Sequence, residues 1–516
     1  MAHVEEDDLP VIANKDDFDK SSGTFMEKLV FNNRAVIAVL CMVVTIVLGY
    51  QAITQLTLQA GFEKMLPKAH EYVINYKKEA NNLKGLGNSL RVVLSTNEGD
   101  IWSKDFLDLM EKVNDDIFFV PGVDRSGMKS IWTPNVRWLT VTEQGFEGGP
   151  VIPAAFNGSP AKIAELKLNV SRASITGDLI ANDGKSVAII VPLLDKDPET
   201  GERLNYYTFT QKLEEIRTKY TQTSTDPEDP RSKFAEGVID IKIVGFAKVI
   251  GELIDGLFAV MGFFLIAVII AWCLMYWYTH CWKSTTTVIA VTIVGVVWQL
   301  GILATLGYEL DPFSILVPFL VFAIGVSHGA QKLNGVIQDV AKGSHHYVAA
   351  RYTFRRLFLA GVTALLSDGV GFAVLMIIQI QVIQDLAITA SIGVLVLIFT
   401  NLILIPIVLS YTGVCQKAVK QSVKSNMTLD DMPGWIAFLL KFTERRWAAG
   451  AIVVGIMCAG VGVWGMQHIQ IGDLDKGAPE LRADSRYNQD VEFVVENYSV
   501  SSDVFAVIVK TEEQQC

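Results

Sequence analysis

The sequence predicts a membrane all-α bundle of seven transmembrane helices that carries a large α+β extracytoplasmic domain. Half of the 516 residues are hydrophobic and the mean hydropathy is +0.33, which indicates an integral membrane protein. Seven apolar runs of about 18 residues or more are long enough to cross the hydrocarbon layer as helices. They lie at 35–54, 257–278, 285–307, 313–332, 358–378, 386–411 and 448–466.

The distribution of charge predicts which side of the membrane each segment faces. Residues 1–34 form an acidic tail, and the first apolar run lacks a small-residue cleavage site, so we expect a retained helix. Lys and Arg gather in the loops 333–356 and 412–447, which the positive-inside rule places in the cytoplasm together with the N-terminus. Residues 58–255 are then expected outside. The spans 257–411 form the main bundle, and 412–447 is an amphipathic cytoplasmic loop.

The outer segment 58–255 alternates β-patterned runs with amphipathic helical runs, which predicts two β-α-β subdomains, one after the other. Asp183 and Gly184 are a hairpin turn signal between two of the runs. The strands are expected at 89–96, 136–143, 175–181, 186–194 and 234–245, and the helices at 69–84, 103–116, 159–171 and 207–220.

A loose internal repeat follows the last span. Gly61 after the first span corresponds to Gly472 after the seventh, 411 residues later, and Pro67 corresponds roughly to Pro479. The strand 89–96 corresponds to 503–511. The repeat predicts that 467–516 begins a second outer domain and that the chain holds only the start of a second six-span unit; chance similarity is the alternative.

Two spans carry ionisable side chains, which are costly in hydrocarbon and usually mark an ion or proton path. In the fourth span, Gly325 and Gly329 have a small-xxx-small spacing that lets helices approach closely, and His328 lies beside this contact. Lys332, one turn on, is interpreted as a lysine that extends to the interface. We expect His328 to take part in proton coupling; the alternative is an ordinary interfacial histidine.

In the fifth span, small residues and one carboxylate share a helical face at spacings of three, four and three. The face consists of Gly361, Ala364, Asp368 and Gly371. We expect a neighbouring helix to cover it and to hide Asp368 from lipid, so that Asp368 can load and release protons. The alternative is that Asp368 only accepts hydrogen bonds from Ser367, Thr363 or a neighbouring helix. Asn401 and the other polar residues of the spans are interpreted as interhelical hydrogen bonders.

Several function classes find no support in the sequence. There is no phosphate-binding loop, dinucleotide fingerprint, G-x-S-x-G or H-E-x-x-H motif, so neither an enzyme nor a cofactor is predicted. His345 and His346 lack further ligands at zinc spacing, and no metal site is expected. The stretches 334–358 and 432–447 are predicted to lie along the inner leaflet and contact lipid head groups. No basic surface for nucleic acid is present.

The order of one span, a large outer α/β domain, five spans and then the same pattern again resembles the resistance-nodulation-division (RND) superfamily. The phrases "VFAIGVSHGAQ", "ALLSDGVGF" and "IQDLAITASIGVLVLIFTNLILIPIVLSY" are similar to its hydrophobe/amphiphile efflux and mycobacterial membrane protein large (MMPL) branch. The resemblance implies a proton-driven permease of the bacterial inner membrane with a periplasmic porter domain. It also implies hydrophobic or amphiphilic substrates, often lipids, and a homo-oligomer or an accessory partner in the periplasm or outer membrane.

The chain departs from that family at one position. Many members carry an aspartate in the fourth span where this chain has Ser327, followed by His328. We therefore expect Asp368 with His328 to replace that aspartate, or the relay to lie in a second half. Two alternatives to an exporter stay open: a sterol-sensing or protein-export accessory member of the superfamily, and a membrane-anchored binding or regulatory protein.

Overall fold

The computed structural model describes most of the chain. The described residues are 9–56, 67, 69–79, 88–143, 145–194, 196–198, 200–202, 204–311, 313–425, 434–469, 477–499 and 507. They form two compact units, which are considered separately: unit 1 comprises residues 1–69 and 257–472, and unit 2 comprises 70–256 and 473–516.

Seven helices among the described residues are long and apolar enough to cross a membrane, which supports a multi-pass membrane protein. Each predicted span coincides with one of them. They are α2 (Arg34–Gln55), α7 (Phe246–Thr279), α8 (Trp282–Thr305), α9 (Val317–Ala341), α10 (His346–Val374), the segment of α11 (Gln381–Leu397), η6 (Ile398–Leu404) and α12 (Ile405–Thr412), and α15 (Arg445–Met466).

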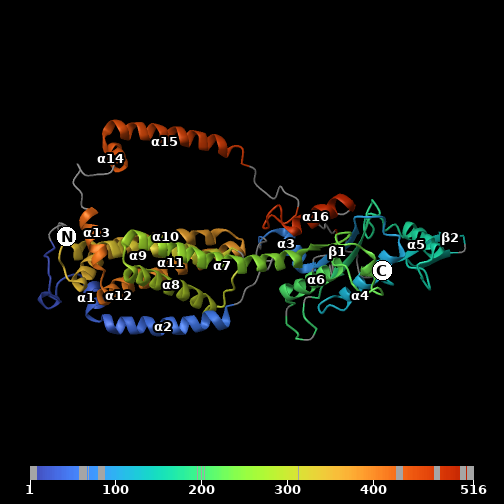
Figure 1. Ribbon diagram of the computed structural model, residues 1–516, viewed down its shortest axis with the longest axis horizontal. Helices are drawn as coiled ribbons and strands as arrows, with labels where there is room; N and C mark the ends of the chain where they lie inside the picture. Colours follow the sequence, from blue (N-terminus) through green and yellow to red (C-terminus); the bar gives the residue numbers. More distant parts are fainter. Residues whose placement is uncertain are drawn as a thin grey trace. The chain divides into compact units, whose positions relative to one another are not determined.

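Helix α8 packs against α2, α9 and α11 in unit 1 (Figure 1). Glycines allow these close approaches. A Cβ at Gly301 would lie 2.3 Å from the carbonyl oxygen of Leu48, and a Cβ at Gly325 would lie 2.5 Å from Thr292 Cγ2. The small residues that the sequence places inside the spans therefore set the distances between helices.

The stretch 334–358 differs from the predicted interfacial helix. It forms the end of α9 and the start of α10, and Tyr347 and Arg351 are buried. The N-terminal segment covers this end: α1 (Phe25–Asn32) supplies Glu27, whose carboxylate accepts from Arg351 Nε at 2.8 Å and from Arg355 Nε at 2.8 Å. The acidic tail thus contributes a buried ion-pair cluster, which polar composition alone did not predict.

The helices α13 (Gln416–Ser425) and α14 (Gly434–Leu440) belong to the predicted loop 412–447. Cys415, just before α13, forms a disulfide with Cys281 at the start of α8. The spacing of 134 residues gave no sign of this pairing. Disulfides persist in oxidising compartments, whereas the Lys and Arg pattern predicts a cytoplasmic location for this end.

Unit 2 contains one three-stranded antiparallel sheet in the order β4-β1-β5, with β1 (Ser89–Thr96) central between β4 (Ser186–Pro192) and β5 (Ile239–Gly245). The helices α3, α4, α5 and α6 are Glu71–Glu79, Lys104–Phe118, Pro160–Ala173 and Tyr206–Thr221. A separate hairpin pairs β2 (Arg137–Thr142) with β3 (Gly145–Pro150).

This sheet differs from two successive β-α-β subdomains, because the strands pair antiparallel in a single layer. The turn at Asp183 and Gly184 is confirmed: Gly184 N–H donates to the carbonyl of Ala181 at 3.0 Å. The run 175–181 makes only isolated bridges, such as Ile180 with Val187, and is not a strand. A β pattern of seven residues is too short to determine its partner.

Both faces of the sheet are buried. Alternate residues of β1 point to opposite sides, so Val92 and Leu94 pack with α4 and α6 while Val93 packs with α16 (Arg486–Asn497). Helix α16 follows the last span, in the segment predicted to begin a second outer domain. Gly61, Gly472 and every residue of the strand predicted at 503–511 except 507 lie outside the described residues.

Candidate functional site

A stripe of small and ionisable residues runs along the buried side of α9. Successive members lie three, four, three and four residues apart, which keeps them on one helical face. This α9 stripe consists of Gly325, His328, Lys332, Gly335 and Asp339. Four of the five are buried, and His328 is partly buried. A span that faced lipid along this side would not carry such residues.

At one end of the stripe, Gly325 contacts the π-helix η6. The side chain of Asn401, which is fully buried, donates from Nδ2 to the Gly325 carbonyl and to Thr292 Oγ1 at 3.4 Å. Thr400 donates to Asn401 Oδ1 at 3.2 Å. Asn401 thus bonds across helices as predicted. A π turn inside an α-helix frequently occurs at functional sites.

In the middle of the stripe, Lys332 is 1% exposed and makes no hydrogen bond or ion pair with another described residue. Its Nζ lies close to Gly361 of α10, 3.4 Å from the place of a Cβ. The prediction that Lys332 extends to the interface is wrong, because α9 continues to Ala341 and the side chain points between helices. Both Lys332 and Asp368 are near enough to act electrostatically on His328.

The carboxylate of Asp368 is exposed in this chain, and so are Ala364 and Gly371. A Cβ at Gly371 would meet no atom within 4 Å, whereas one at Gly361 would meet Leu402 at 2.8 Å. Helix α10 instead buries Gly361, Leu365 and Gly369. Asp368 is one residue, about 100°, from that face, and no described neighbour hides it as expected. Its role in proton coupling stays a prediction.

Of the other two predicted site residues on α9, Gly329 lies on a packed face and Ser327 on an exposed face. A Cβ at Gly329 would lie 2.4 Å from Val288 Cγ1, so Gly329 is a helix contact. Ser327 is exposed and points away from the stripe. At the far end, Asp339 accepts from Arg356 Nη2 at 2.7 Å.

Several buried polar atoms of this bundle have no hydrogen-bond partner among the described residues. They include Gln299 Oε1 of α8, His328 Nδ1 of α9 and Thr353 Oγ1 of α10. Gln299 and Thr353 are both fully buried. Unpartnered polar atoms are rare in protein interiors and call for an explanation. Here they accompany the unpaired Lys332, which singles out the bundle interior as the candidate site.

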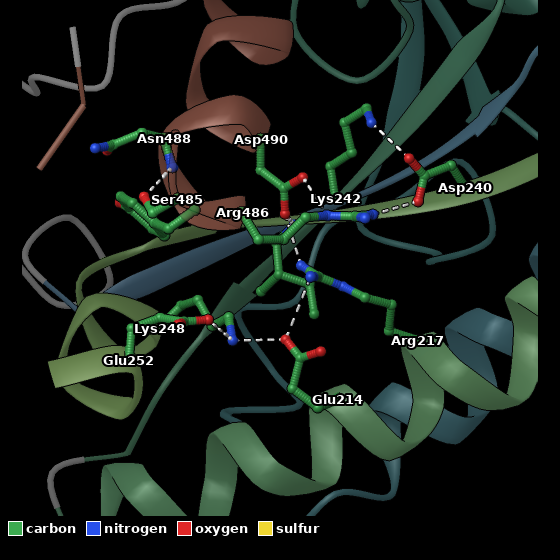
Figure 2. A network of polar contacts seen from close by, with 12 residues as sticks. Glu214, Arg217, Asp240, Lys242, Lys248, Glu252, Ser485, Arg486, Asn488 and Asp490 are labelled. Carbon is green, nitrogen blue, oxygen red and sulfur yellow. Dashed lines mark hydrogen bonds and ion pairs between the residues drawn. The ribbon is translucent and has the colours of Figure 1, made fainter. Parts of the chain in front are cut away.

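Unit 2 contains a second cluster of buried charge, with a different character (Figure 2). Asp490 of α16 accepts from Arg217 Nη2 at 2.6 Å and from the backbone N–H of Ile243 at 3.0 Å. Glu214 is 3.4 Å from Arg217 and 2.6 Å from Lys248. Burial in this cluster raises the pKa of Asp490. Because each charge has partners, we interpret the cluster as a structural contact that holds α16 against α6 and β5.

Sequence reasoning missed three features of the bundle. The burial of Lys332 could have been predicted from two signals: it lies four residues after His328, on the same helical face, and the helix continues well beyond it. The two polar residues Thr400 and Asn401, shortly before Pro406, were a signal for irregular helix. The Glu27 cluster had no local signal, because its members are more than 300 residues apart.

No protein-family model matches this chain, and no curated protein matches it in sequence. Among the described residues, no group of three or more His, Cys, Asp or Glu side chains is placed to hold a metal ion.

Proposed function

We propose that this chain is part of a proton-coupled secondary transporter of the RND type, which exports hydrophobic or amphiphilic molecules such as lipids or drugs. The observation that carries the proposal is Lys332, an ionisable side chain buried without a partner inside a membrane-spanning bundle. Such residues are expensive and typically belong to ion or proton pathways. The resemblance of the sequence to the RND superfamily supplies the substrate class.

In this proposal, the charge on the α9 stripe sets the packing of α9 against α10. Lys332 lies beside Gly361, where the two helices are close, and His328 is one turn away. Loss of a proton from the Lys332 ammonium removes a charge from this contact and favours a tighter arrangement. Asp368, on the exposed side of α10, receives the proton or donates it. Alternation between the two charge states drives transport.

The test is proton flux in vesicles that contain the protein and a trapped pH-sensitive dye, with a fluorescent amphiphile as substrate. Lys332→Met is expected to reduce substrate-dependent proton flux more than about tenfold, because the apolar side chain cannot change charge. Lys342→Met is the matched control, since Lys342 is exposed at the end of the same helix, and it should transport normally. Normal proton flux in Lys332→Met refutes the central role of Lys332.

Two further variants test the predicted coupling residues His328 and Asp368. His328→Ala and Asp368→Asn are each expected to lower coupled flux, because each removes a group that acts electrostatically within the site. Undiminished coupled transport by Asp368→Asn eliminates the version in which Asp368 replaces the family's fourth-span aspartate.

A specific observation favours a second candidate, a membrane-anchored binding protein. Transport through the outer domain calls for an apolar tunnel, yet β1, α4 and α6 enclose a filled core in the described part of unit 2. One cavity there, beside Leu109 and Tyr220, has a volume of about 10 Å³. An open cleft beside Phe119 offers about 340 Å³. Binding of the amphiphile by the unsubstituted chain, without any transport of it, supports this candidate.

A further inference from the structure

The hairpin of β2 and β3 has one covered face and one open face. Burial alternates along β2 with period two, as expected for a ribbon whose two sides differ. The even-numbered side lies toward α5: the Arg172 guanidinium is over the Trp138 ring at 5.0 Å. The odd-numbered side faces away from the rest of unit 2.

The open face is apolar in its centre. Val141 pairs directly with Phe146 across the ladder, and Leu139 pairs with Gly148, so the three apolar side chains adjoin on one side. Their exposed fractions are 62% for Leu139, 74% for Val141 and 77% for Phe146. Adjacent large apolar residues at this exposure indicate an interaction surface, especially when polar residues border them.

Opposite charges border the apolar centre at its two ends. Arg137 begins β2 and Glu143 follows its last residue, six residues further on, and both are exposed. Neither side chain has an ion-pair partner among the described residues. When a second ribbon lies face to face with its β2 antiparallel, residue 137 of each chain meets residue 143 of the other. Leu139 then meets Val141 of the second copy.

We propose that this face is a self-complementary contact between two copies of the chain. A two-fold axis brings the same patch of both copies together. This patch has opposite charges at its two ends, so each charge meets its opposite in the second copy. The contact involves one ribbon per chain, which is small for a protein interface. We therefore expect a reversible association in the membrane rather than a permanent dimer. This contact is independent of the proposed transport function.

Charge reversal tests the contact in vesicles with donor-labelled and acceptor-labelled full chains, by energy transfer between them. Arg137→Glu alone and Glu143→Arg alone place like charges at both ends, and each is expected to weaken association about tenfold. A mixture of Arg137→Glu chains with Glu143→Arg chains restores opposite charges and should recover association. The double variant should also recover it. Arg137 and Glu143 are both exposed, and recovery in the mixture excludes loss of folding as the cause of weaker association.

A second measurement tests the register. Leu139→Cys chains mixed with Val141→Cys chains should form an intermolecular disulfide under mild oxidation, several-fold faster than Thr140→Cys chains, because residue 140 is on the other side. Energy transfer that is unchanged in both single reversals overturns the proposal. Loss in both singles without recovery in the mixture also overturns it, because that result assigns the face to another occupant.

Discussion

The Glu27 cluster and the α9 stripe both bury charge in unit 1, but they treat it in opposite ways. Arg351 is fully buried, and its guanidinium donates to Glu27 at 2.8 Å and to the Tyr347 hydroxyl at 3.2 Å. Lys332 is buried to nearly the same extent, yet its ammonium has no partner among the described residues. Ion pairs in the Glu27 cluster compensate the free-energy cost of removing these charges from water. For Lys332, no ion pair compensates that cost.

This difference distinguishes charges that stabilise the fold from charges whose protonation state can change during function. A paired charge is fixed in one state because removing its partner is costly. An unpaired charge in a low-dielectric interior is sensitive to protonation, and its environment favours the neutral form. Asp490 in unit 2 is also paired, with Arg217, although burial raises the pKa of its carboxyl group. The comparison predicts that variants at paired and unpaired sites shift stability in opposite directions.

The largest effect is expected at Glu27. Glu27→Gln keeps the shape of the side chain but leaves Arg351 and Arg355 without a counter-charge. We expect a loss of about 3–5 kcal/mol in the free energy of unfolding of unit 1. Denaturant unfolding in detergent, followed by tryptophan fluorescence, measures it. A change in the free energy of unfolding below about 1 kcal/mol would show that the Glu27 cluster does not stabilise unit 1.

A smaller loss is expected at Asp490. Asp490→Asn removes the main partner of Arg217, but Glu214 remains 3.4 Å away, so we expect a loss of about 2–3 kcal/mol. Limited proteolysis measures this loss: the Asp490→Asn variant should be cleaved within 477–499 faster than the unsubstituted chain. Asp484→Asn is the control, because the Arg482 and Asp484 side chains are 84% and 73% exposed, and breaking such a pair changes stability by less than about 1 kcal/mol. Equal proteolysis of both variants contradicts the structural role of Asp490.

The opposite sign is expected at Lys332. Lys332→Met replaces an uncompensated buried charge with an apolar side chain of similar length. We expect unchanged stability or a gain of about 1 kcal/mol, since such replacements are often neutral or stabilising. The midpoint of thermal unfolding in detergent reports it. A marked loss of stability would indicate that Lys332 has a stabilising partner, and it would remove the contrast with Glu27.

The smallest effect concerns a paired carboxylate near the surface of unit 2. A hydrogen bond from Arg231 lowers the pKa of Asp229 to about 2, from an ordinary 3.8. The folded state therefore gains stability from this charge above about pH 4 and loses it as the pH falls toward 2. Asp229→Asn should lower the thermal midpoint slightly at pH 6 and leave it unchanged near pH 2. An equal difference at both pH values contradicts the linkage.

Each predicted span coincides with a long apolar helix, because hydrophobic length is a local property. Each apolar run, such as that of α8, satisfies its backbone hydrogen bonds within itself and needs no distant partner to form a helix. The strand run 175–181 failed for the opposite reason: a strand exists only when a neighbour bonds along it, and this run makes only the isolated Ile180–Val187 bridge to the adjacent β4.

The candidate site was predicted in part. Helical periodicity placed His328 and Lys332 on one stripe of α9, but it did not say that Lys332 is buried. For α10, the pattern of small residues predicted a buried face through Asp368, whereas packing selects Gly361, Leu365 and Gly369. A displacement of one residue is enough to expose the carboxylate, because it rotates the helical position by about 100°.

The sequence by itself therefore determined the seven apolar helices, the turn at Asp183 and Gly184, and the shared α9 face of Gly325, His328 and Lys332. These follow from chain-local length and periodicity. Only the tertiary structure decided which face of α10 is covered, that Glu27 meets Arg351, and that α16 closes the second face of the β1 sheet. The contacts of Glu27 and of α16 join residues hundreds of positions apart. The free energy of all these contacts depends on the burial and pairing of side chains, which no local pattern records.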